Sequence, residues 1–383
     1  MKQYIPLTEG LSLGIIYKTM DIEEKKEKER RVKELLEKEG LDALLLNKQH
    51  NFAWFTGGGR NYVFTGTERG AVCLLLTRKE KILIANNIEA PRILEEEIEK
   101  DEFDLREFGW HQNQKETIES FIKGKRVGSD DGFPGTINIS TKIDSLRCSL
   151  TSSEVERYRQ LGKTLSIKVE KVCQEIKSGD KENEIAGRTS DALLSEGILP
   201  IVLLIAADER IEKFRHPLPT DKKIAKYVMV VVCGRKWGLI VSLTRLVYFG
   251  KVPLELRKKH EAVTRIDTVL IANTLPGKPF AEILQKGIQT YQETGFPQEW
   301  QNHHQGGPTG YQPRDYKVTL KEKRKVEPSQ AVAWNPSIRG TKSEDTIIAL
   351  PAGPEIISST SSWPKLKVSY QEKTWERPDI LEK

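Results

Sequence analysis

The sequence predicts an α+β protein built from two domains. Its 383 residues exceed what one ordinary hydrophobic core accommodates. Over residues 1–150, helical and strand patterns alternate, which is typical of a small α/β domain. Over residues 151–383, pairs of helices are followed by segments that favour antiparallel strands. We therefore expect one domain at 1–150 and a second at 151–383.

The N-terminal half carries clear helix and strand signals. Residues 22–40 alternate in charge sign and place Val32, Leu35 and Leu36 on one face, which predicts an amphipathic helix that ends at Gly40. The segment "LDALLLN" at 41–47 predicts a buried strand. Further expected elements are a hairpin over 70–86 that turns at Arg78–Lys79, an acidic helix at 89–99 and a strand at 126–130.

The C-terminal half opens with two helices. Thr151 and Glu154 have the spacing of a capping box, which predicts the start of a long helix that ends at Gly179. A second helix is expected at 181–196. The remaining expectations are a strand at 199–207, two strands over 227–250 joined by a turn at 234–238, helices at 254–274 and 279–294, and a strand-rich remainder.

Composition argues against several classes of partner. The net charge is +6, from 61 basic and 55 acidic residues that are interspersed, and the basic segment "LKEKRKVEP" has no accompanying aromatic or glycine pattern. We therefore expect no nucleic-acid partner. The longest apolar runs are too short to span a bilayer, and "MKQYIPLTEGLSLG" lacks the apolar core of a signal peptide. Hence we expect no membrane partner.

The cysteine spacing indicates a reducing compartment. Cys73, Cys148, Cys173 and Cys233 lie far apart and form no CxxC pair. This pattern favours free thiols over a disulfide framework or a structural zinc site. We therefore expect a cytoplasmic protein.

Two adjacent histidines precede a glycine-rich turn in "HHQGGPTGY", residues 303–311. If the segment is a strand, His303 and His304 point to opposite faces and cannot both ligate one ion. A phosphate-binding loop would need a Lys-Ser or Lys-Thr pair, which is absent. We therefore favour a structural interpretation of this segment over a metal site.

Two further segments could carry chemistry. His216 in "KFRHPLPTDKK" could act as a general acid or base near neutral pH, although an isolated histidine is more often structural. Glu344 and Asp345 introduce an apolar strand in "SEDTIIAL". Successive strand residues face opposite ways, so only one of the two can point into a site. The alternative is that both are solvated at a strand end.

Together these segments resemble the creatinase / Xaa-Pro peptidase family. "LDALLLNKQHNFAWFTG" is similar to the family's N-terminal domain, and "SSEVERYRQLGKTLSIKVEKVCQEIKSGDKENEIA" is similar to the helices that open its catalytic domain. "RHPLPTDKK", "SLTR", "HHQGGPTGY" and "SEDTI" follow in the family's order. The resemblance implies an α+β fold with a creatinase-like N-terminal α/β domain and a C-terminal pita-bread domain.

The resemblance also implies that most of the family's metal ligands are missing. Its peptidases bind two metal ions through two Asp, one His and two Glu. Glu344 alone keeps its ligand type, and the other four positions fall on Val232, Ser242, Gly307 and Asn335. The spacing from Val232 to Ser242 is one residue short of the family's, but residues 226–250 contain no acid at all. We therefore expect no metal and no other cofactor.

Creatinase has this fold and resembles a metal-free hydrolase of C–N bonds, which suggests roles for the remaining residues. By this resemblance His216 is the catalytic acid or base and Glu344 the carboxylate that orients a cationic group. Arg314, at the position of a second family histidine, and Arg60 would hold a substrate carboxylate. His304 and Asn335 are further expected substrate contacts.

The leading expectation is a metal-independent hydrolase acting on a C–N bond of a small amidino, amide or imino compound. Arg60 lies where the family's N-terminal domain reaches into the partner subunit's site, so a homodimer is implied, unless Arg60 is an ordinary loop arginine. The alternatives are an Xaa-Pro dipeptidase or aminopeptidase, a non-catalytic protein that binds a small molecule or short peptide, and a lyase on the same scaffold.

Overall fold

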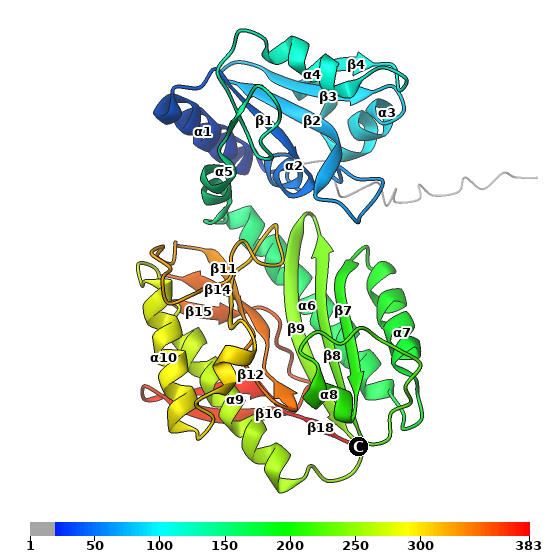
Figure 1. The fold of residues 1–383 in the computed structure, drawn as a ribbon, viewed down its shortest axis with the longest axis vertical. Coiled ribbons are helices and arrows are strands. Elements are labelled where there is room, and N and C mark those ends of the chain that lie inside the picture. The colour runs from blue at the N-terminus through cyan, green and yellow to red at the C-terminus, as the bar shows by residue number, and fades with distance from the viewer. Residues whose placement is uncertain (1–19) are drawn as a thin grey trace, which may run out of the picture.

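The computed structural model describes residues 20–383, and its fold is α+β as the sequence predicts (Figure 1). The expectation about the N-terminal segment at 1–14 lies outside the described residues. Elements up to Arg147 form an upper part in Figure 1, and elements from Ser152 onward form the lower part. Among the described residues, no helix is both long enough and apolar enough to cross a bilayer.

The upper part is one six-stranded sheet with helices around it, in the strand order β4-β3-β2-β1-β5-β6. Its strands are β1 (Ala43–Lys48), β2 (Arg69–Thr77), β3 (Lys81–Asn86), β4 (Asp104–Phe108), β5 (Val127–Ser129) and β6 (Ile137–Asn138). Its helices are α1 (Ile22–Glu39), α2 (Gln49–Phe55), α3 (Ala90–Arg92), η1 (Ile93–Glu97), η2 (Lys100–Glu102), α4 (Gln114–Ile122) and α5 (Ser140–Arg147).

Local signals explain α1, whereas α2 has no counterpart among the expected elements and the acidic helix differs from expectation. Gly40 ends α1 with φ of 61°, a left-handed conformation that suits glycine. All seven residues of α2 are buried, so this helix has no polar face that a sequence pattern could reveal. The acidic helix begins as α3 but continues as the π-helix η1, which ends at Glu97.

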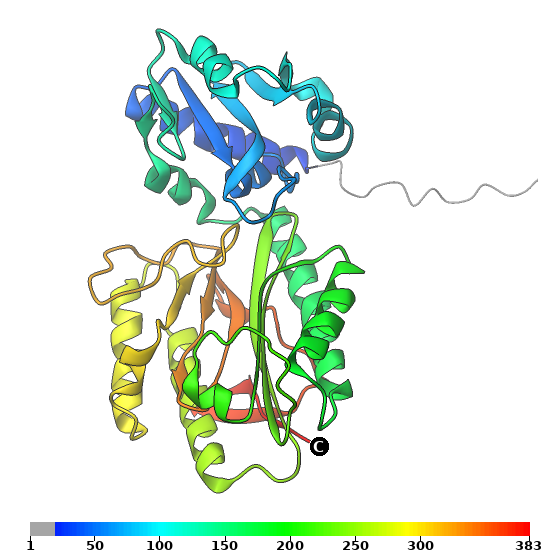
Figure 2. The same cartoon turned by 45° about the vertical axis from the view of Figure 1, so that its right-hand side comes forward.

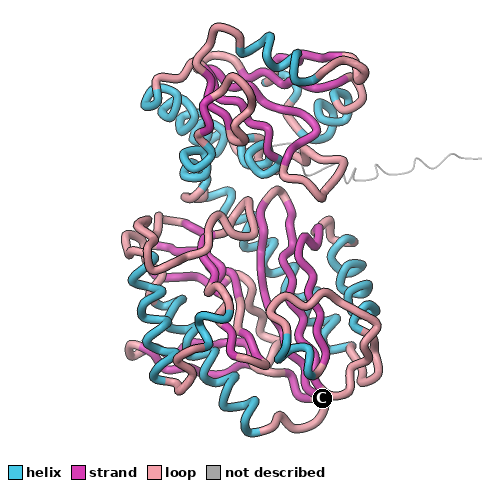
Figure 3. The backbone as a smooth tube through the Cα atoms, in the orientation of Figure 1, coloured by secondary structure: helices cyan, strands magenta, loops and turns pink. Residues whose placement is uncertain are grey.

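The lower part holds two four-stranded sheets and the two-stranded sheets β12-β13 and β16-β17. The tube view of Figure 3 shows helices beside these strands. The first has the order β18-β9-β8-β7 and the second β10-β11-β14-β15. Helices α6 and α7 pack against the first sheet, and α9, with α10 beside it, packs against the second (Figure 2).

The elements of the lower part follow in order of sequence. The helices are α6 (Ser152–Glu175), α7 (Glu182–Leu194), α8 (Glu209–Lys213), α9 (Leu254–Ala272), α10 (Phe280–Glu293) and the 3-10 helix η3 (Glu299–Asn302). The strands are β7 (Leu199–Ala207), β8 (Tyr227–Lys236), β9 (Leu239–Tyr248), β10 (Gly306–Pro308), β11 (Gln330–Trp334), β12 (Ser337–Ile338), β13 (Thr341–Lys342), β14 (Asp345–Leu350), β15 (Gly353–Ile356), β16 (Lys365–Tyr370), β17 (Lys373–Pro378) and β18 (Leu381–Glu382).

Two expected boundaries move for tertiary reasons. The capping box of Thr151 and Glu154 is present, but α6 ends at Glu175, before Gly179, whose N–H donates to the carbonyl of Ile224 at 2.8 Å. The turn between β8 and β9 is also shorter than expected. It consists of Trp237 and Gly238, which both have positive φ, as a tight two-residue hairpin turn requires.

The two sheets of the lower part are joined along β9 and β14. The backbone N–H of Ser242 donates to the hydroxyl of Thr346 at 2.8 Å, and that hydroxyl donates to the Ser242 carbonyl at 2.9 Å. The N–H of Thr244 donates to the carbonyl of Glu344 at 3.1 Å. This seam brings residues about 100 positions apart in the sequence into contact, and it carries the candidate site.

Candidate functional site

Glu344 lies directly before β14 and is the centre of the candidate site. Its carboxylate is 2% exposed and contacts two cations: Lys342 Nζ lies 2.7 Å from Oε2, and Arg314 Nη2 lies 2.9 Å from Oε1. The hydroxyl of Thr244 also donates to Oε2 at 2.8 Å. Burial alone would raise the pKa of Glu344, but the charges of Lys342 and Arg314 bring it down to about 2. Glu344 is therefore ionised at neutral pH.

The neighbouring Asp345 faces the other way, as strand alternation predicts. It contacts Arg245 at 3.1 Å and Arg377 at 2.7 Å in a separate, fully buried network. The alternative that both carboxylates are solvated is wrong, because Asp345 is fully buried and Glu344 nearly so. Glu344 is thus the member of the pair that belongs to the candidate site.

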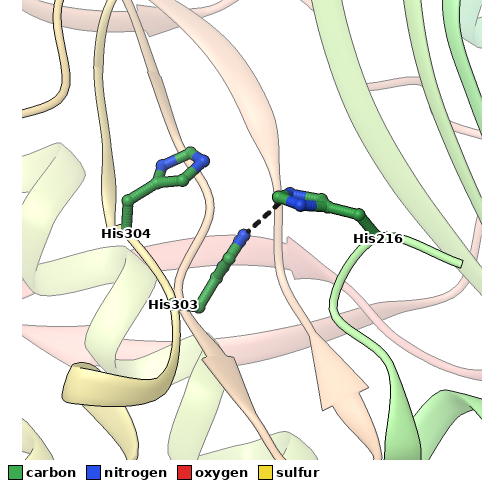
Figure 4. A group of neighbouring side chains, drawn as sticks. All are labelled: His216, His303 and His304. Atoms are coloured by element: carbon green, nitrogen blue, oxygen red, sulfur yellow. Dashed lines mark hydrogen bonds between the residues drawn. The ribbon is translucent and has the colours of Figure 1, made fainter.

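Figure 4 shows three histidine side chains that lie together, and the charge of Glu344 acts on each of them. His216 comes from the loop after α8, and His303 and His304 come from the segment between η3 and β10. Nε2 of His303 lies 3.2 Å from Nε2 of His216, and the ring centroids of His303 and His304 are 4.5 Å apart. We call these histidines together with Arg314, Lys342 and Glu344 the site cluster.

The expectation that His303 and His304 point to opposite faces is wrong. Both residues precede β10, which begins at Gly306, so the alternation of a strand does not apply to them. His303 ends the 3-10 helix η3, and both rings then turn toward His216. One nitrogen from each ring can be chosen so that all three atoms lie within 4.8 Å of one another.

The surroundings keep all three imidazoles neutral. Burial, followed by the charge of Lys342, lowers the pKa of His303 to about 2. Burial and the charge of Arg314 lower the pKa of His304 to about 3. The pKa of His216, which is the most exposed of the three, is also lowered by partial burial and by Lys342. The unprotonated ring nitrogens can therefore act as bases or as metal ligands at neutral pH.

The residues at the family's metal-ligand positions do not fit two divalent ions. Arg314 bridges two of these positions, because Nη1 lies 3.4 Å from the hydroxyl of Ser242 while Nη2 contacts Glu344. At Gly307 a Cβ atom would lie 2.4 Å from the carbonyl oxygen of Tyr316, so a histidine side chain has no room there. The guanidinium of Arg314 thus lies between Ser242 and Glu344, which are two of the positions where the family's ligands would face the metals.

The strand register corrects the assignment of the first missing ligand. Ser242 is paired with Cys233, and the Ser242 hydroxyl lies 3.1 Å from the Cys233 sulfur. Val232 is paired with Leu243 and its side chain is in the main hydrophobic core. The residue that faces the site on β8 is therefore Cys233, the strand partner of Ser242, and not Val232. Burial raises the pKa of the Cys233 thiol.

Arg60 and Asn335 are two further expected substrate contacts. Arg60 lies apart from the site cluster within one chain: its Nη2 pairs with Glu97 at 2.8 Å, and it lines a cavity of about 220 Å³ between the upper and lower parts. Asn335 is buried, and within the described part of the chain its Oδ1 has no hydrogen-bond partner.

Lys342 is a member of the site cluster that motif matching does not reveal. It is 6% exposed and supplies a second cation to Glu344. A lysine inside the apolar-flanked segment "RGTKSEDTI" is a weak signal, because lysines are common throughout this chain. Its position two residues before Glu344, on the same side of an extended segment, is the feature that could have indicated it.

Comparisons with known proteins now settle the family. The family model for the creatinase/prolidase N-terminal domain matches residues 29–160, and the model for metallopeptidase family M24 matches residues 156–350. The chain belongs to metallopeptidase family M24. This confirms the creatinase / Xaa-Pro peptidase family and the pita-bread domain that the motifs implied. Among the curated proteins, none matches the chain significantly in sequence.

Solved structures of this M24 fold match nearly the whole chain at low identity. The prolidase from Pyrococcus horikoshii OT3 superposes with a TM-score of 0.76 at 18% identity, covering 88% of this chain and 99% of its own. The Xaa-Pro dipeptidase from Bacillus anthracis gives 0.75 at 17% identity, covering 94% and 99%. At these identities the likeness establishes the fold.

The same fold also occurs in a subunit of a larger complex. The N-terminal domain of FACT complex subunit SPT16 from Cicer arietinum superposes with a TM-score of 0.68 at 12% identity, covering 90% of this chain and 98% of its own. Proteins with this architecture therefore include one described by its place in a complex as well as others described as peptidases.

Proposed function

We propose that this M24 protein recognises short peptides of the Xaa-Pro class through a peptide carboxylate, at a site that lacks the family's dinuclear centre. The observation that carries this proposal is the charge of the site cluster. Two cations, Lys342 and Arg314, face a single carboxylate, Glu344. An incoming carboxylate would offset the excess positive charge and would be held by charge-assisted hydrogen bonds. The prolidase and dipeptidase neighbours support the Xaa-Pro class over creatine-like compounds.

Calorimetric titration of a Gly-Pro dipeptide, its C-terminal amide and creatine tests this proposal. We expect the free dipeptide to bind at least about tenfold more tightly than the amide, since a hydrogen bond to a charged group contributes about 1.5–3 kcal/mol. Arg314→Gln should abolish this difference, because Gln cannot form the ion pair. Arg78→Gln, at an exposed turn between β2 and β3, is the matched control. Equal affinities for acid and amide, or tighter binding of creatine, would reject the proposed ligand class.

A second candidate is metal-independent hydrolysis of the bound C–N bond, and the state of His216 favours it. His216 is exposed, unprotonated at neutral pH, and lies 3.2 Å from His303. It would accept a proton from the water that attacks the carbonyl carbon and return that proton to the leaving nitrogen.

An assay for the release of proline tests this second candidate. The protein is incubated with the dipeptide in the presence of a chelator, and mass spectrometry measures the proline released. His216→Ala should lower the rate by about 100-fold or more, which is the usual scale for a positioned acid or base. If the peptides bind but no proline is released by the unmodified protein, the protein is a binding member of the family rather than a hydrolase.

We also infer that the site is completed in a homodimer, with Arg60 directed at the partner's site cluster. Within the described part of the chain, Arg60 pairs with Glu97 at 2.8 Å, and about half of its side chain stays exposed. Light scattering should give twice the chain mass of 43.6 kDa at micromolar concentration. A monomer under those conditions, or unchanged peptide affinity in Arg60→Ala, would contradict this arrangement.

A further inference from the structure

The three histidines of the site cluster have the geometry of a metal site that differs from the family's dinuclear centre. Their ring nitrogens lie within 4.8 Å of one another, and the pair formed by His216 and His303 is 3.2 Å apart (Figure 4). Zinc binds imidazole nitrogen at about 2.0–2.1 Å, so two ligands of a tetrahedral ion are about 3.4 Å apart. Small rotations of the His304 side chain would bring the third nitrogen into that range.

The ligand atoms are also available. Across the described residues, Nδ1 of His304 is buried and has no hydrogen-bond partner. Nε2 of His303 faces only the Nε2 of His216, and two unprotonated ring nitrogens at 3.2 Å repel one another unless a proton or a metal ion lies between them. On its other side, Nδ1 of His303 lies 3.4 Å from the hydroxyl of Ser337, in the position of a group that orients a metal-bound ring.

We propose that His216, His303 and His304 form a mononuclear site for a first-row transition-metal dication such as Zn²⁺, with a fourth position open to an anion. Three imidazoles suit zinc, cobalt, nickel or copper and do not suit magnesium or calcium, which require oxygen ligands. The described residues offer one carboxylate in the cluster, Glu344, and both of its oxygens are engaged by Lys342, Arg314 and Thr244. The fourth ligand therefore comes from solvent or from a bound molecule, which can enter beside the exposed His216.

The charges nearby make metal and anion binding interdependent. Lys342 and Arg314 raise the local positive potential and oppose a bare dication. An anion in the fourth position contacts both the metal and these cations, so each ligand strengthens the binding of the other. A metal ion at this site would occupy the lone pair that His216 needs to act as a base. Metal binding and the role of His216 as a base are therefore mutually exclusive, whereas peptide recognition through Arg314 and Lys342 does not depend on the metal.

Titration of metal-free protein with Co²⁺, followed by visible absorption, and with Zn²⁺, followed by calorimetry, tests the site. We expect one equivalent of each metal per chain, and a cobalt spectrum of the intensity that four-coordinate ions give. His216→Ala and His304→Ala should each weaken zinc binding by at least about 100-fold, since even the loss of an outer-shell partner costs 10–100-fold. His111→Ala, an exposed histidine of the upper part, is the matched control and should bind as the unmodified protein does.

Acetate supplies a second readout. Adding acetate at millimolar concentration should tighten zinc binding several-fold in the unmodified protein and less in Arg314→Gln. Because His216 is exposed, His216→Ala should fold normally, and circular dichroism checks this. Zinc affinity that survives in both His216→Ala and His304→Ala, or binding of less than half an equivalent, would overturn the site. Peptide binding in the presence of a chelator is independent of this result, so failure of the metal site leaves the proposed peptide recognition standing.

Discussion

Two charged clusters lie on opposite faces of the seam between β9 and β14, and they differ in how their charge is balanced. Thr244 and Glu344 point toward the site cluster, whereas Arg245 and Asp345, each the next residue along, enter a buried network with Glu170, Asp267 and Arg377. In that network each guanidinium lies between two carboxylates. In the site cluster one carboxylate lies between two cations.

The difference shows which cluster supports the fold and which is open to ligands. Three carboxylates face two arginines in the buried network, and burial raises the pKa of Asp267, so a proton taken up there can relieve the excess negative charge. The site cluster has excess positive charge, because Lys342 and Arg314 share the single carboxylate of Glu344. An anion from outside is therefore the means by which the site cluster becomes neutral, and the exposed His216 marks its access to solvent.

The largest effect on stability is expected from breaking the buried network. Arg245→Met removes a fully buried guanidinium that contacts Glu170 at 2.8 Å and Asp345 at 3.1 Å. Asp345 keeps Arg377 at 2.7 Å, but the buried carboxylate of Glu170 loses its ion-pair partner, and breaking a buried pair in this way costs about 3–5 kcal/mol. Denaturant unfolding should show this decrease in the free energy of unfolding. A change below about 1 kcal/mol would mean that the network does not support the fold.

An intermediate effect is expected from acid, acting on Glu344. Its folded pKa of about 2 lies below the ordinary value of 4.5, so the unfolded chain binds more protons between these values. The stabilisation is complete above about pH 4.5 and is lost as the pH falls toward 2, by about 3 kcal/mol in all. Unfolding measured at about pH 5 and about pH 3 should show a smaller loss in Glu344→Gln than in the unmodified protein. Parallel losses in both would assign the acid sensitivity to other carboxylates.

The smallest effect on stability is expected from Arg314→Gln in the site cluster. Glu344 keeps Lys342 at 2.7 Å and Thr244 at 2.8 Å in this variant, and the excess positive charge disappears. The free energy of unfolding should therefore change by less than about 1 kcal/mol, while binding of carboxylates weakens at least about tenfold. A destabilisation as large as that of Arg245→Met would make the two clusters equivalent and remove the contrast between them.

Much of the fold could be predicted because the signals are local. The glycine that ends α1 and the capping box that opens α6 act within a few residues of the chain, and the structure keeps both. The helix α2 could not be predicted in this way, because it is buried on every side and has no amphipathic pattern. The end of α6 also depends on a contact with Ile224, about 50 residues away.

The features of the candidate site can likewise be separated into those that depend on local sequence and those that depend on long-range contacts. The sequence by itself indicated the family, because motif order and residue type are properties of the chain, and this resemblance implied that most of the family's metal ligands are replaced. It also determined that Glu344 and Asp345 face opposite ways, since strand alternation is local. Only the tertiary structure decided that His303 and His304 turn together toward His216, that Cys233 and not Val232 faces the site, and that Lys342 and Arg314 share one carboxylate. These features depend on strand register and on loops that meet across β9 and β14. Such long-range contacts produce no periodic pattern in the sequence, so they cannot be predicted from it.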